Sequence, residues 1–469
     1  MNTNGVSDYL VVGAGAMGMA FTDVLMTETE ATVTIVDRHG RPGGHWNDSY
    51  PFVRLHQPSS FYGVNSRALG VNQKDSIGLN AGLYELASGS EVVTYFEQVM
   101  NQQFLPTGRV TYLPMCEYLG NGSVRNLVSG VEKTIEAEKT VDATYMNVTV
   151  PSVTTPNYTV SQGVTCIPPN GLLNLDEFPG DYVVVGGGKT AIDSCLWLLG
   201  NGVNPDGIRW IVPRDQWMLD RASIQPGEEF AVQALLRQVE TMEIAAESIS
   251  VDQMFDELVQ RGALLQFDRS VRPTMYRCCT VTVAELDELR RIHNVVRMGR
   301  VQKIGLDRID LDHGTIPTSS ETVHVDCTAD GLANRPVRPI FEPGHLTLQT
   351  VRTCQQVFSA AFIAHVEAAY DDDETKNEIC KVVPHPNDTL DWVRTTKDNA
   401  LNSIRWNSDP DLKEWLSNAR LDGFSRAKRD VARGPGEQEL VARIMEATPV
   451  ALGKLEKYLQ VGRVDVIQT

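Results

Sequence analysis

Two stretches of the chain share one pattern of apolar and polar positions. Each is a short apolar run followed at once by glycines and then by residues with helical spacing; the runs are Tyr9–Val12 and Tyr182–Val185. A second apolar, β-branched run follows each helical stretch, at Thr32–Val36 and Ile208–Val212. A short apolar run bounded by turn residues is typical of a buried strand. The pattern therefore predicts two β-turn-α-β units, and with them parallel sheets covered by helices.

The rest of the pattern predicts a meander, a connection and further helices around these units. Short segments between 109 and 145, separated by glycines, predict a meander of strands. The composition of 149–179 shifts to proline, threonine and asparagine, which favours a connection between domains. Helical spacing predicts helices at 91–100, 230–247, 251–261 and 347–367 and a charged helical tail after Asp371, and alternating positions predict strands at 299–312 and 322–327.

The first unit carries a glycine fingerprint with the spacing of a dinucleotide-binding turn. Gly13 permits the tight turn, Gly15 lets the backbone approach a pyrophosphate, and Gly18 lets the helix pack on the strand. The start of the helix then offers unpaired N–H groups to the phosphates. Asp37 ends the next strand nineteen positions after Gly18, where an acid is expected to bind a ribose.

The second unit repeats the fingerprint with Gly186, Gly188 and Ala191. Alanine in the third place still permits close packing of helix and strand. Arg214 follows the next strand, where an acid would bind NADH, and its guanidinium suits the 2′-phosphate of NADPH. We expect Arg221 to assist it. A shorter echo links the two halves, since 141–144 (Val-Asp-Ala-Thr) resembles 325–328 (Val-Asp-Cys-Thr).

Two dinucleotide sites in one chain favour two cofactors, FAD at the first site and NADPH at the second. Hydride then passes from the nicotinamide to the flavin, and the cofactors carry the difficult chemistry. This interpretation explains why no Ser/His/Asp set, zinc motif or pair of catalytic carboxylates stands out. No metal site is predicted.

With these motifs, the chain resembles the class B flavin monooxygenases over about residues 8–368. Besides the two fingerprints and Asp37, the resemblance rests on Gly43-Gly44-His45-Trp46, which matches the Gly-Gly-x-Trp element of that family. It also rests on 325–331, which resembles the late strand and turn that return to the FAD.

The resemblance implies roles for further residues. Gly44 and Trp46 would lie against the flavin, and one of Arg54, His56 and Gln57, on the following loop, would bind the flavin ring or the substrate. Asp330 would lie at the turn that meets the FAD. Gln349 would lie near the start of a helix whose N-terminus points at the flavin, where its dipole stabilises negative charge.

The activity that the resemblance implies is an FAD-dependent, NADPH-using monooxygenase. It would insert one oxygen of O2 into a small molecule through a flavin peroxide. The family's Phe-x-Gly-x-x-x-His fingerprint is replaced here by 167–173 (Ile-Pro-Pro-Asn-Gly-Leu-Leu), without histidine. This departure argues against Baeyer–Villiger chemistry and leaves oxygenation at N or S open. An oxidase or NAD(P)H-linked reductase, and a flavin-binding sensor or scaffold without turnover, are the alternatives.

Length and composition set the outer bounds. A chain of 469 residues is too long for one core. We expect an α/β protein with two doubly wound Rossmann-like dinucleotide-binding domains and a helical C-terminal tail. The expected ranges are 1–175 for the FAD-binding domain, 176–321 for the NADPH-binding domain, 322–369 for the return segment of the FAD-binding domain and 370–469 for the helical region.

The net charge of −18 argues against nucleic-acid partners and anionic membranes. The eight cysteines form no Cys-x-x-Cys pair, and the adjacent Cys278 and Cys279 suit neither zinc nor an easy disulfide, so reduced thiols in the cytoplasm are expected. No feature predicts the oligomeric state or the substrate.

Overall fold

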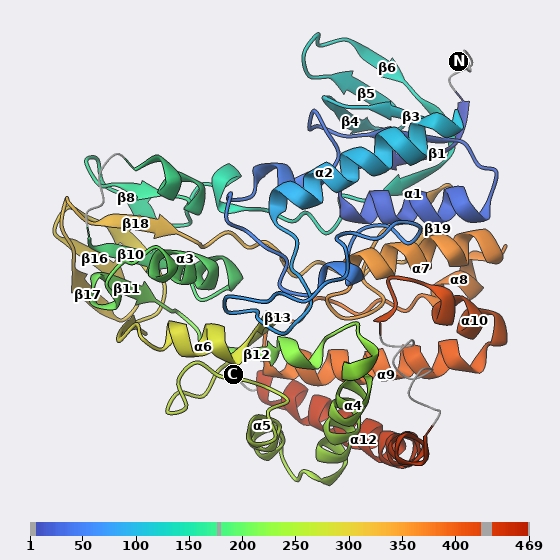
Figure 1. Ribbon diagram of the computed structural model, residues 1–469. Coiled ribbons are helices and arrows are strands. Elements are labelled where there is room, and N and C mark those ends of the chain that lie inside the picture. Colours follow the sequence, from blue (N-terminus) through green and yellow to red (C-terminus); the bar gives the residue numbers. More distant parts are fainter. Residues whose placement is uncertain (1–5, 176–179, 424–433, 468–469) are drawn as a thin grey trace.

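The computed structural model describes residues 6–175, 180–423 and 434–467, and within these ranges it forms three bodies, each with its own buried core (Figure 1). The first is built on a six-stranded sheet of order β19-β20-β7-β1-β2-β3, parallel except for β19. Side chains alternate across it, so Val11 faces a helical layer and Leu10 faces a small antiparallel sheet. The strands of the main sheet are β1 (Val6–Val12), β2 (Val33–Val36), β3 (Val110–Leu113), β7 (Glu136–Asp142), β19 (Phe341–Glu342) and β20 (His345–Thr347).

Helices and a three-stranded sheet cover the two faces of this sheet. Helices α1 (Ala16–Glu28) and α7 (Gln356–Ala369) pack on each other and, with α2 (Gly89–Val99), form the helical layer. Ser88 caps α2 with a complete capping box. The other face is covered by β4 (Cys116–Gly120), β5 (Ser123–Asn126) and β6 (Glu132–Thr134).

The second body repeats this arrangement. Its five-stranded parallel sheet has the order β14-β11-β10-β18-β9, with helices on one face and an antiparallel sheet on the other. The strands are β9 (Cys166–Ile167), β10 (Tyr182–Val185), β11 (Ile208–Ile211), β14 (Asn294–Val296) and β18 (Val323–Asp326). The covering elements are α3 (Lys189–Gly200) and α6 (Val283–Leu289) on one face, and β15 (Val301–Ile304), β16 (Arg308–Leu311) and β17 (Gly314–Pro317), joined by β8 (Thr159–Val160), on the other. The two doubly wound units that the sequence predicts are thus confirmed.

The short sequence echo marks equivalent strands of the two units. Strand β7 pairs with β1 and places Asp142 beside Val12; strand β18 pairs with β10 and places Asp326 beside Val185. In both turns the aspartate accepts hydrogen bonds from the backbone N–H and the hydroxyl of the threonine two positions later. Each Asp-x-Thr turn therefore closes the strand end next to a glycine loop.

The third body is helical and was not predicted as a unit. Helices α4 (Glu228–Glu247) and α5 (Val251–Gln260) pack with α9 (Thr389–Ser408) and α12 (Pro435–Ile467) around the parallel strands β12 (Gln216–Asp220) and β13 (Met275–Val281). Trp217, Phe255 and Trp392 form its aromatic centre. Two shorter helices, α8 (Asp373–Ile379) and α10 (Pro410–Asn418), pack instead beside α7. The helical character of the tail is confirmed.

Several predicted boundaries are wrong. The sequence assigned 322–369 to the first unit, but β18 pairs with β10 in the second sheet, and the chain returns to the first sheet only at β19. The predicted break at 175/176 adjoins 176–179, which lie outside the described residues. The helix expected at 347–367 begins only at Gln356, because Thr347 continues β20. The expected meander is split, since β3 and β7 belong to the main sheet.

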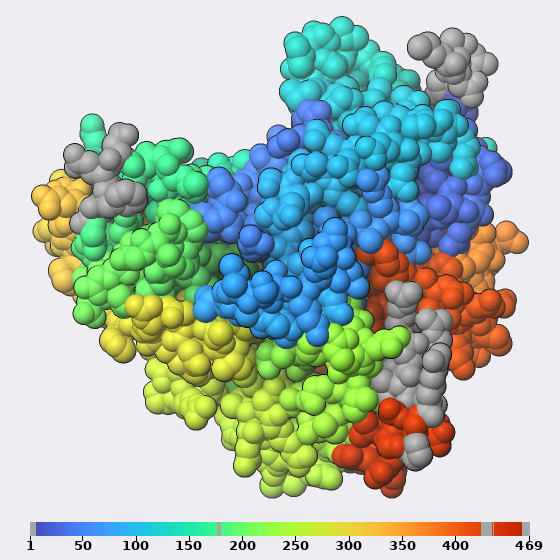
Figure 2. Space-filling view, viewed as in Figure 1, coloured from blue at the N-terminus to red at the C-terminus, as the bar shows by residue number. Residues whose placement is uncertain are grey.

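The first body reaches across the junction of the other two. Figure 2 shows the segment around residues 60–85 lying against the yellow-green residues of the second and third bodies. The hydrogen bonds that join these surfaces include those from the Tyr84 N–H to the Gln225 Oε1 and from the Thr282 hydroxyl to the Leu79 carbonyl. Within the described residues, no helix combines the length and apolarity needed to span a bilayer.

Candidate functional site

The first glycine loop has the backbone that the fingerprint predicts. Gly13 has a φ of +103°, in the region that favours glycine, and a Cβ on Gly18 would lie 2.0 Å from the Gly13 carbonyl oxygen. Gly15 is the N-cap of α1, which has no side-chain cap and no acidic residue in its first turn. The first N–H groups of this helix are therefore available to an anion.

Asp37 is buried, and its carboxylate already holds the turn together. One oxygen accepts from the Ala14 N–H at 2.6 Å, and the other accepts from the backbone and the Nδ1 of His39 at 2.7 and 2.9 Å. The His39 Nε2 lies 3.0 Å from Asp48. The hydrogen bond to Asp37 raises the pKa of His39, against the opposing effect of burial. Because each carboxylate oxygen has two lone pairs, Asp37 can still accept a ribose hydroxyl.

The Gly-Gly-x-Trp element packs directly on the first glycine loop. Gly44 has a φ of +55°, and a Cβ there would lie 2.9 Å from the Gly15 Cα. Gly44 also begins a short 3-10 helix, Gly44–Asp48. The Trp46 indole donates to the Tyr62 hydroxyl at 2.7 Å and meets that ring edge-on. The structure thus packs Gly44 on the first glycine loop and places Trp46 in the same short 3-10 helix.

The next loop leaves the first unit and contacts the start of α3 in the second. The Tyr50 hydroxyl donates to Asp193 at 2.6 Å, and the Phe52 ring stacks on Trp197 at 4.9 Å between ring centroids. Asp193 also pairs with Lys189, the first residue of α3. This contact was not predicted from the sequence. The spacing of Lys189 and Asp193 on one helix face is the only signal that it left.

His56 lies on this loop between the two glycine loops and is uncharged at neutral pH. Burial, with the nearby cations Lys189 and Arg221, lowers its pKa to about 3. The His56 Nδ1 accepts a hydrogen bond from the Thr280 N–H at 3.3 Å, so the ring proton resides on Nε2. His56 is therefore a neutral hydrogen-bond donor at the junction of the two units.

The other two candidates on this loop take different directions. The Gln57 Oε1 accepts from the Gln355 side chain, at 3.1 Å, and Gln355 is the N-cap of α7. Gln57 thus lies at the helix start that the resemblance places near the flavin. Arg54 is exposed and donates to the Leu86 carbonyl at 2.9 Å. The structure brings His56 and Gln57 into the junction and leaves Arg54 at the surface.

The second glycine loop mirrors the first. Gly186 has a φ of +130°, and a Cβ there would lie 2.8 Å from the Cys327 carbonyl. Gly188 is the N-cap of α3, again without a side-chain cap or an acid in the first turn, and the space beside its Cα is open. Ala191 is fully buried in the helix–sheet core, where the fingerprint needs a small residue.

Arg214 lies where the sequence predicts a 2′-phosphate ligand. It follows β11, at the edge of the sheet where the glycine loop leaves β10. Its guanidinium donates to the carbonyls of Thr274 and Asn387, at 2.7 and 3.2 Å. Arg277 and Arg300 are close enough to lower the pKa of Arg214, in addition to the effect of burial. Asp388 and Asp391 act on the pKa of Arg214 in the opposite sense, so arginines and aspartates both lie near the predicted phosphate position.

The contacts of Arg221 do not fit its predicted role of assisting Arg214 in binding the 2′-phosphate. It is 1% exposed, and its five donors are satisfied within the protein. Both oxygens of Glu285 accept from it, at 3.0 and 2.9 Å. The remaining acceptors are the carbonyls of His56 and Thr280 and the Asn80 side chain. A guanidinium that is buried and fully paired has no donor left for a phosphate, so Arg221 joins the bodies rather than binding coenzyme.

Gln349 and Asp330 occupy the segment that returns from the second unit to the first. The buried Gln349 amide forms two hydrogen bonds with the backbone of Arg338, so it fixes a loop in this structure. Asp330 is exposed and pairs with Arg277 at 2.5 Å. The Asp330 carbonyl accepts from Thr149, on the outgoing connection. These two residues lie on the segment that crosses between the units, and they are far from the first glycine loop in the sequence.

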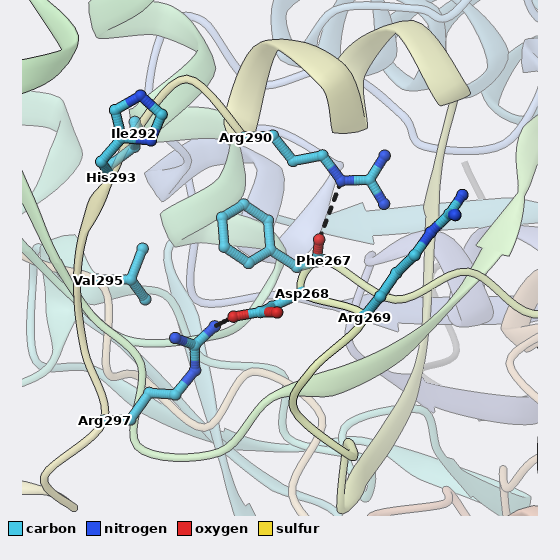
Figure 3. Close-up of a pocket in the computed structure, with 8 residues that line it drawn as sticks. All are labelled: Phe267, Asp268, Arg269, Arg290, Ile292, His293, Val295 and Arg297. Atoms are coloured by element: carbon cyan, nitrogen blue, oxygen red, sulfur yellow. Dashed lines mark hydrogen bonds and ion pairs between the residues drawn. The ribbon is translucent and has the colours of Figure 1, made fainter.

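An arginine-rich pocket opens elsewhere on the second unit (Figure 3). The Arg290 Nε donates to the Phe267 carbonyl, and Arg297 pairs with Asp268 and Asp215. None of the predicted site residues lines this pocket. Two of its arginines are thus engaged by protein oxygens, and the fingerprint residues define a different site.

The comparisons with known proteins place the chain in a family. A model described as an NAD(P)-binding Rossmann-like domain matches residues 11–59, which contain the first glycine loop and Asp37. The chain is 52% identical over 441 residues to Uncharacterized protein Rv2000 of Mycobacterium tuberculosis. This alignment covers 94% of this chain and 82% of the relative. The chain belongs to the same family as this mycobacterial protein. Uncharacterized protein Mb2023 of Mycobacterium bovis shows the same identity and coverage.

Solved structures show only distant likeness to this member of the family. Cyclohexanone monooxygenase from Rhodococcus sp. Phi1, bound to NADP+, has 13% identity and a TM-score of 0.47, with 94% of this chain and 98% of that chain covered. A flavin-containing monooxygenase from Stenotrophomonas maltophilia has 13% identity and a TM-score of 0.42, with 80% and 99% covered. Both are named as monooxygenases.

Proposed function

We propose that this protein is a flavin-dependent monooxygenase that uses NADPH and transfers one oxygen atom of O2 to a nucleophilic nitrogen or sulfur of a small molecule. One observation carries the proposal. Two glycine loops with dinucleotide geometry lie in one chain, and the loop 50–57 of the first unit rests on the helix that begins at the second glycine loop.

The residues at the first loop fit FAD. Glycines 13, 15 and 18 leave the backbone bare beside an uncapped helix start, which suits a pyrophosphate. The Asp37 carboxylate lies at the end of β2, where a ribose is bound in this fold. Gly44 and Trp46 continue the same surface.

The residues at the second loop fit NADPH. Open space lies beside Gly188 at the second uncapped helix start, and Arg214 supplies a cation at the end of β11. Lys189, now paired with Asp193, stands at the first helical position and adds a second cation for the pyrophosphate. When bound, the two cofactors would supply hydride transfer and oxygen activation.

The chain's own residues position the reactants and hold protons between the loops. Neutral His56 offers its Nε2 proton to a carbonyl or an oxygen atom without adding charge. The Phe52–Trp197 stack and the Tyr50–Asp193 hydrogen bond hold the loop on α3 and would help to exclude water from the junction. Exclusion of water is what a transferred oxygen atom requires, because hydrolysis and peroxide release compete with transfer.

The test is anaerobic mixing of the FAD-loaded protein with NADPH, followed by addition of 18O2 and an amine or thioether. We expect loss of the flavin absorbance on NADPH addition and one labelled oxygen atom in the product. Reduction by NADPH followed by release of hydrogen peroxide, with no label in any product, would instead indicate an oxidase. If neither NADPH nor NADH reduces the flavin, the proposal fails.

A further inference from the structure

A disulfide joins Cys278 of β13 to Cys354, two positions before α7 begins. The Cα atoms are 6.5 Å apart, and the residues are 76 positions apart in the sequence. Cys278 is buried, whereas Cys354 is half-buried. The expectation of eight reduced thiols is therefore wrong for this pair. Nothing in the Cys278-Cys279 doublet indicated that its first cysteine would reach a partner so distant in the chain.

The disulfide lies beside the loop predicted to contact the flavin. On one side, the Thr280 N–H, two residues after Cys278, donates to the His56 Nδ1 at 3.3 Å. On the other side, the Gln355 amide, one residue after Cys354, donates to the Gln57 Oε1 at 3.1 Å. His56 and Gln57, which are adjacent in the loop, are thus hydrogen-bonded to residues that closely follow each of the two cysteines.

A histidine contacts the more exposed sulfur. The His385 Nδ1 lies 3.8 Å from the Cys354 Sγ, and the His385 Nε2 lies 3.1 Å from the Gln356 amide nitrogen. Because an amide nitrogen only donates, the His385 Nε2 accepts and its Nδ1 carries the proton. Burial and then Arg277 lower the pKa of His385 to about 4, so the ring is neutral. Its N–H therefore points at Cys354 and would stabilise a thiolate there.

The backbone at both cysteines is strained. Cys278 has a φ of +55° and Cys354 a φ of +58°, in the left-handed region that residues with a Cβ rarely adopt. Such strain clusters at functional sites. The neighbouring Cys279 is buried and free, so proximity of cysteines alone does not explain which one pairs.

We propose that Cys278–Cys354 is a redox centre that takes two electrons from the NADPH-reduced flavin. The S–S bond breaks, and two electrons with two protons yield two thiols while the flavin is oxidised. The net change is NADPH, one proton and the disulfide giving NADP+ and the dithiol. The protein thereby stores four electrons, two on the flavin and two on sulfur. This inference rests on the proposed function only for the source of the electrons.

The test is anaerobic titration of the FAD-loaded protein with NADPH, with the thiols of the Cys278 and Cys354 peptides counted by alkylation and mass spectrometry. We expect the wild type to consume twice as much NADPH per flavin as the Cys278→Ser/Cys354→Ser variant and to gain two thiols at these positions. Cys279→Ser, which removes the adjacent free thiol, should behave as the wild type. Complete flavin reduction by one equivalent of NADPH, with both positions unalkylated, would overturn the inference.

A second arm separates this inference from the proposed function. If NADPH leaves the flavin oxidised, the proposed function fails, and dithionite then supplies the electrons. Thiols that appear at Cys278 and Cys354 only when FAD is bound support the relay. Thiols that form equally in FAD-free protein, or in neither sample, refute it.

Discussion

Buried and half-buried arginines of the second unit differ in how many of their donors the protein uses. Arg221 is fully paired and holds Glu285. Within the described residues, the hydrogen bonds of Arg214 go to two carbonyls and to the Thr274 hydroxyl, and none goes to a carboxylate. A guanidinium at the end of β11 that is not hydrogen-bonded to a carboxylate is available to bind a phosphate. The side chain alone does not reveal this difference, since both residues are arginines shortly after β11.

We therefore expect Arg214→Gln to weaken NADPH binding selectively. Loss of a hydrogen bond to a charged group costs about 2 kcal/mol, which raises the Kd of NADPH about thirtyfold. The Kd of NADH should change less than twofold. Titration of both coenzymes against the FAD-loaded protein measures this, with Arg291→Gln, an exposed arginine paired with Glu288, as the control. An equal loss for both coenzymes would place Arg214 away from the 2′-phosphate.

A second residue-scale prediction concerns the buried Glu367 on α7. It accepts from Lys376 at 2.8 Å, from Lys139 at 2.5 Å and from the Tyr9 hydroxyl at 2.8 Å. Burial raises its pKa, but the hydrogen bonds from the two lysines outweigh this and hold the pKa below its ordinary value of 4.5. Glu367→Gln removes the nearer carboxylate of the buried Lys376 and leaves it only Asp373, at 3.6 Å. We therefore expect a loss of about 3 kcal/mol in the free energy of unfolding at pH 7.

The pH dependence of this loss has a defined sign. A carboxyl whose pKa is lower in the folded state than in the unfolded state stabilises the fold at pH values above its unfolded pKa. This contribution disappears as the pH falls through the folded pKa. The difference between wild type and Glu367→Gln should therefore be full at pH 6 and shrink below pH 4.5. Urea unfolding at several pH values measures it, and the exposed Glu342→Gln provides the control. A difference that does not change with pH would contradict the ion-pair explanation.

At the scale of elements, the junction between the first glycine loop and the 3-10 helix Gly44–Asp48 has no room for a side chain. Gly44→Ala must both adopt a φ of +55° and place a Cβ 2.9 Å from the Gly15 Cα. Gly78 has a φ of +77° with open space around it. Gly78→Ala should therefore lose only the free energy of placing alanine at a positive φ, about 1 kcal/mol, without a steric clash. We expect Gly44→Ala to lose about 1–3 kcal/mol more than this control.

The same pair of variants separates stability from cofactor binding. Gly44→Ala should also weaken FAD binding, because the displaced helix carries Trp46, whereas Gly78→Ala should bind FAD as the wild type does. Urea unfolding and FAD titration measure the two effects. Equal behaviour of both variants would mean that the contact with Gly15 does not shape the cofactor site.

The elements that the sequence predicted well are those whose signal is local. An apolar run followed by glycines identified β1, β10 and both loops, and helical spacing found α4 and α5 to within two residues. The start of α7 was missed by nine residues, because the apolar stretch from 347 first completes β20 and then turns. Periodicity alone does not distinguish a buried strand from a buried helix segment.

The site residues followed the same rule. Gly13, Gly44 and Gly186 belong to glycine motifs, and each has a positive φ that favours glycine. The pairing of Arg221 with Glu285 and of Cys278 with Cys354 depends on segments that meet only after folding. No local pattern reports such contacts, and this is why one arginine was assigned to the coenzyme and the disulfide was overlooked.

At the scale of the whole molecule, the proposed transfer of electrons between two cofactors requires the three cores to keep fixed positions relative to one another. The third core combines α4 and α5 with helices about 150 to 200 residues further along the chain, so its existence follows from tertiary packing rather than from chain order. The disulfide and Arg221 tie this body to the other two. The first and second units meet through the loop that contains Tyr50.

The Tyr50 hydroxyl bond to Asp193 should therefore affect electron transfer between the units more than stability. Tyr50→Phe removes one hydrogen bond to a charged group and leaves the ring in place, so the loop shifts relative to α3 while FAD remains bound. A displacement of about 1 Å between reactants can cost up to a hundredfold in rate, and we expect a loss of about tenfold in flavin reduction by NADPH. Stopped-flow absorbance under anaerobic conditions measures this rate.

Tyr370→Phe is the matched control, because its hydroxyl donates to Asp409 at 3.0 Å within the C-terminal helical region, away from the junction of the two units. Both variants should lose a similar free energy of unfolding, about 1–2 kcal/mol for a hydrogen bond to a carboxylate. Of the two tyrosine variants, only Tyr50→Phe should slow flavin reduction. The losses caused by Tyr50→Phe and Asp193→Ala should be less than additive, since the two residues share one contact and Asp193 alone also pairs with Lys189. Additive losses in the double variant would show that the two residues act separately, and the junction would then have to be held by the Phe52–Trp197 stack instead.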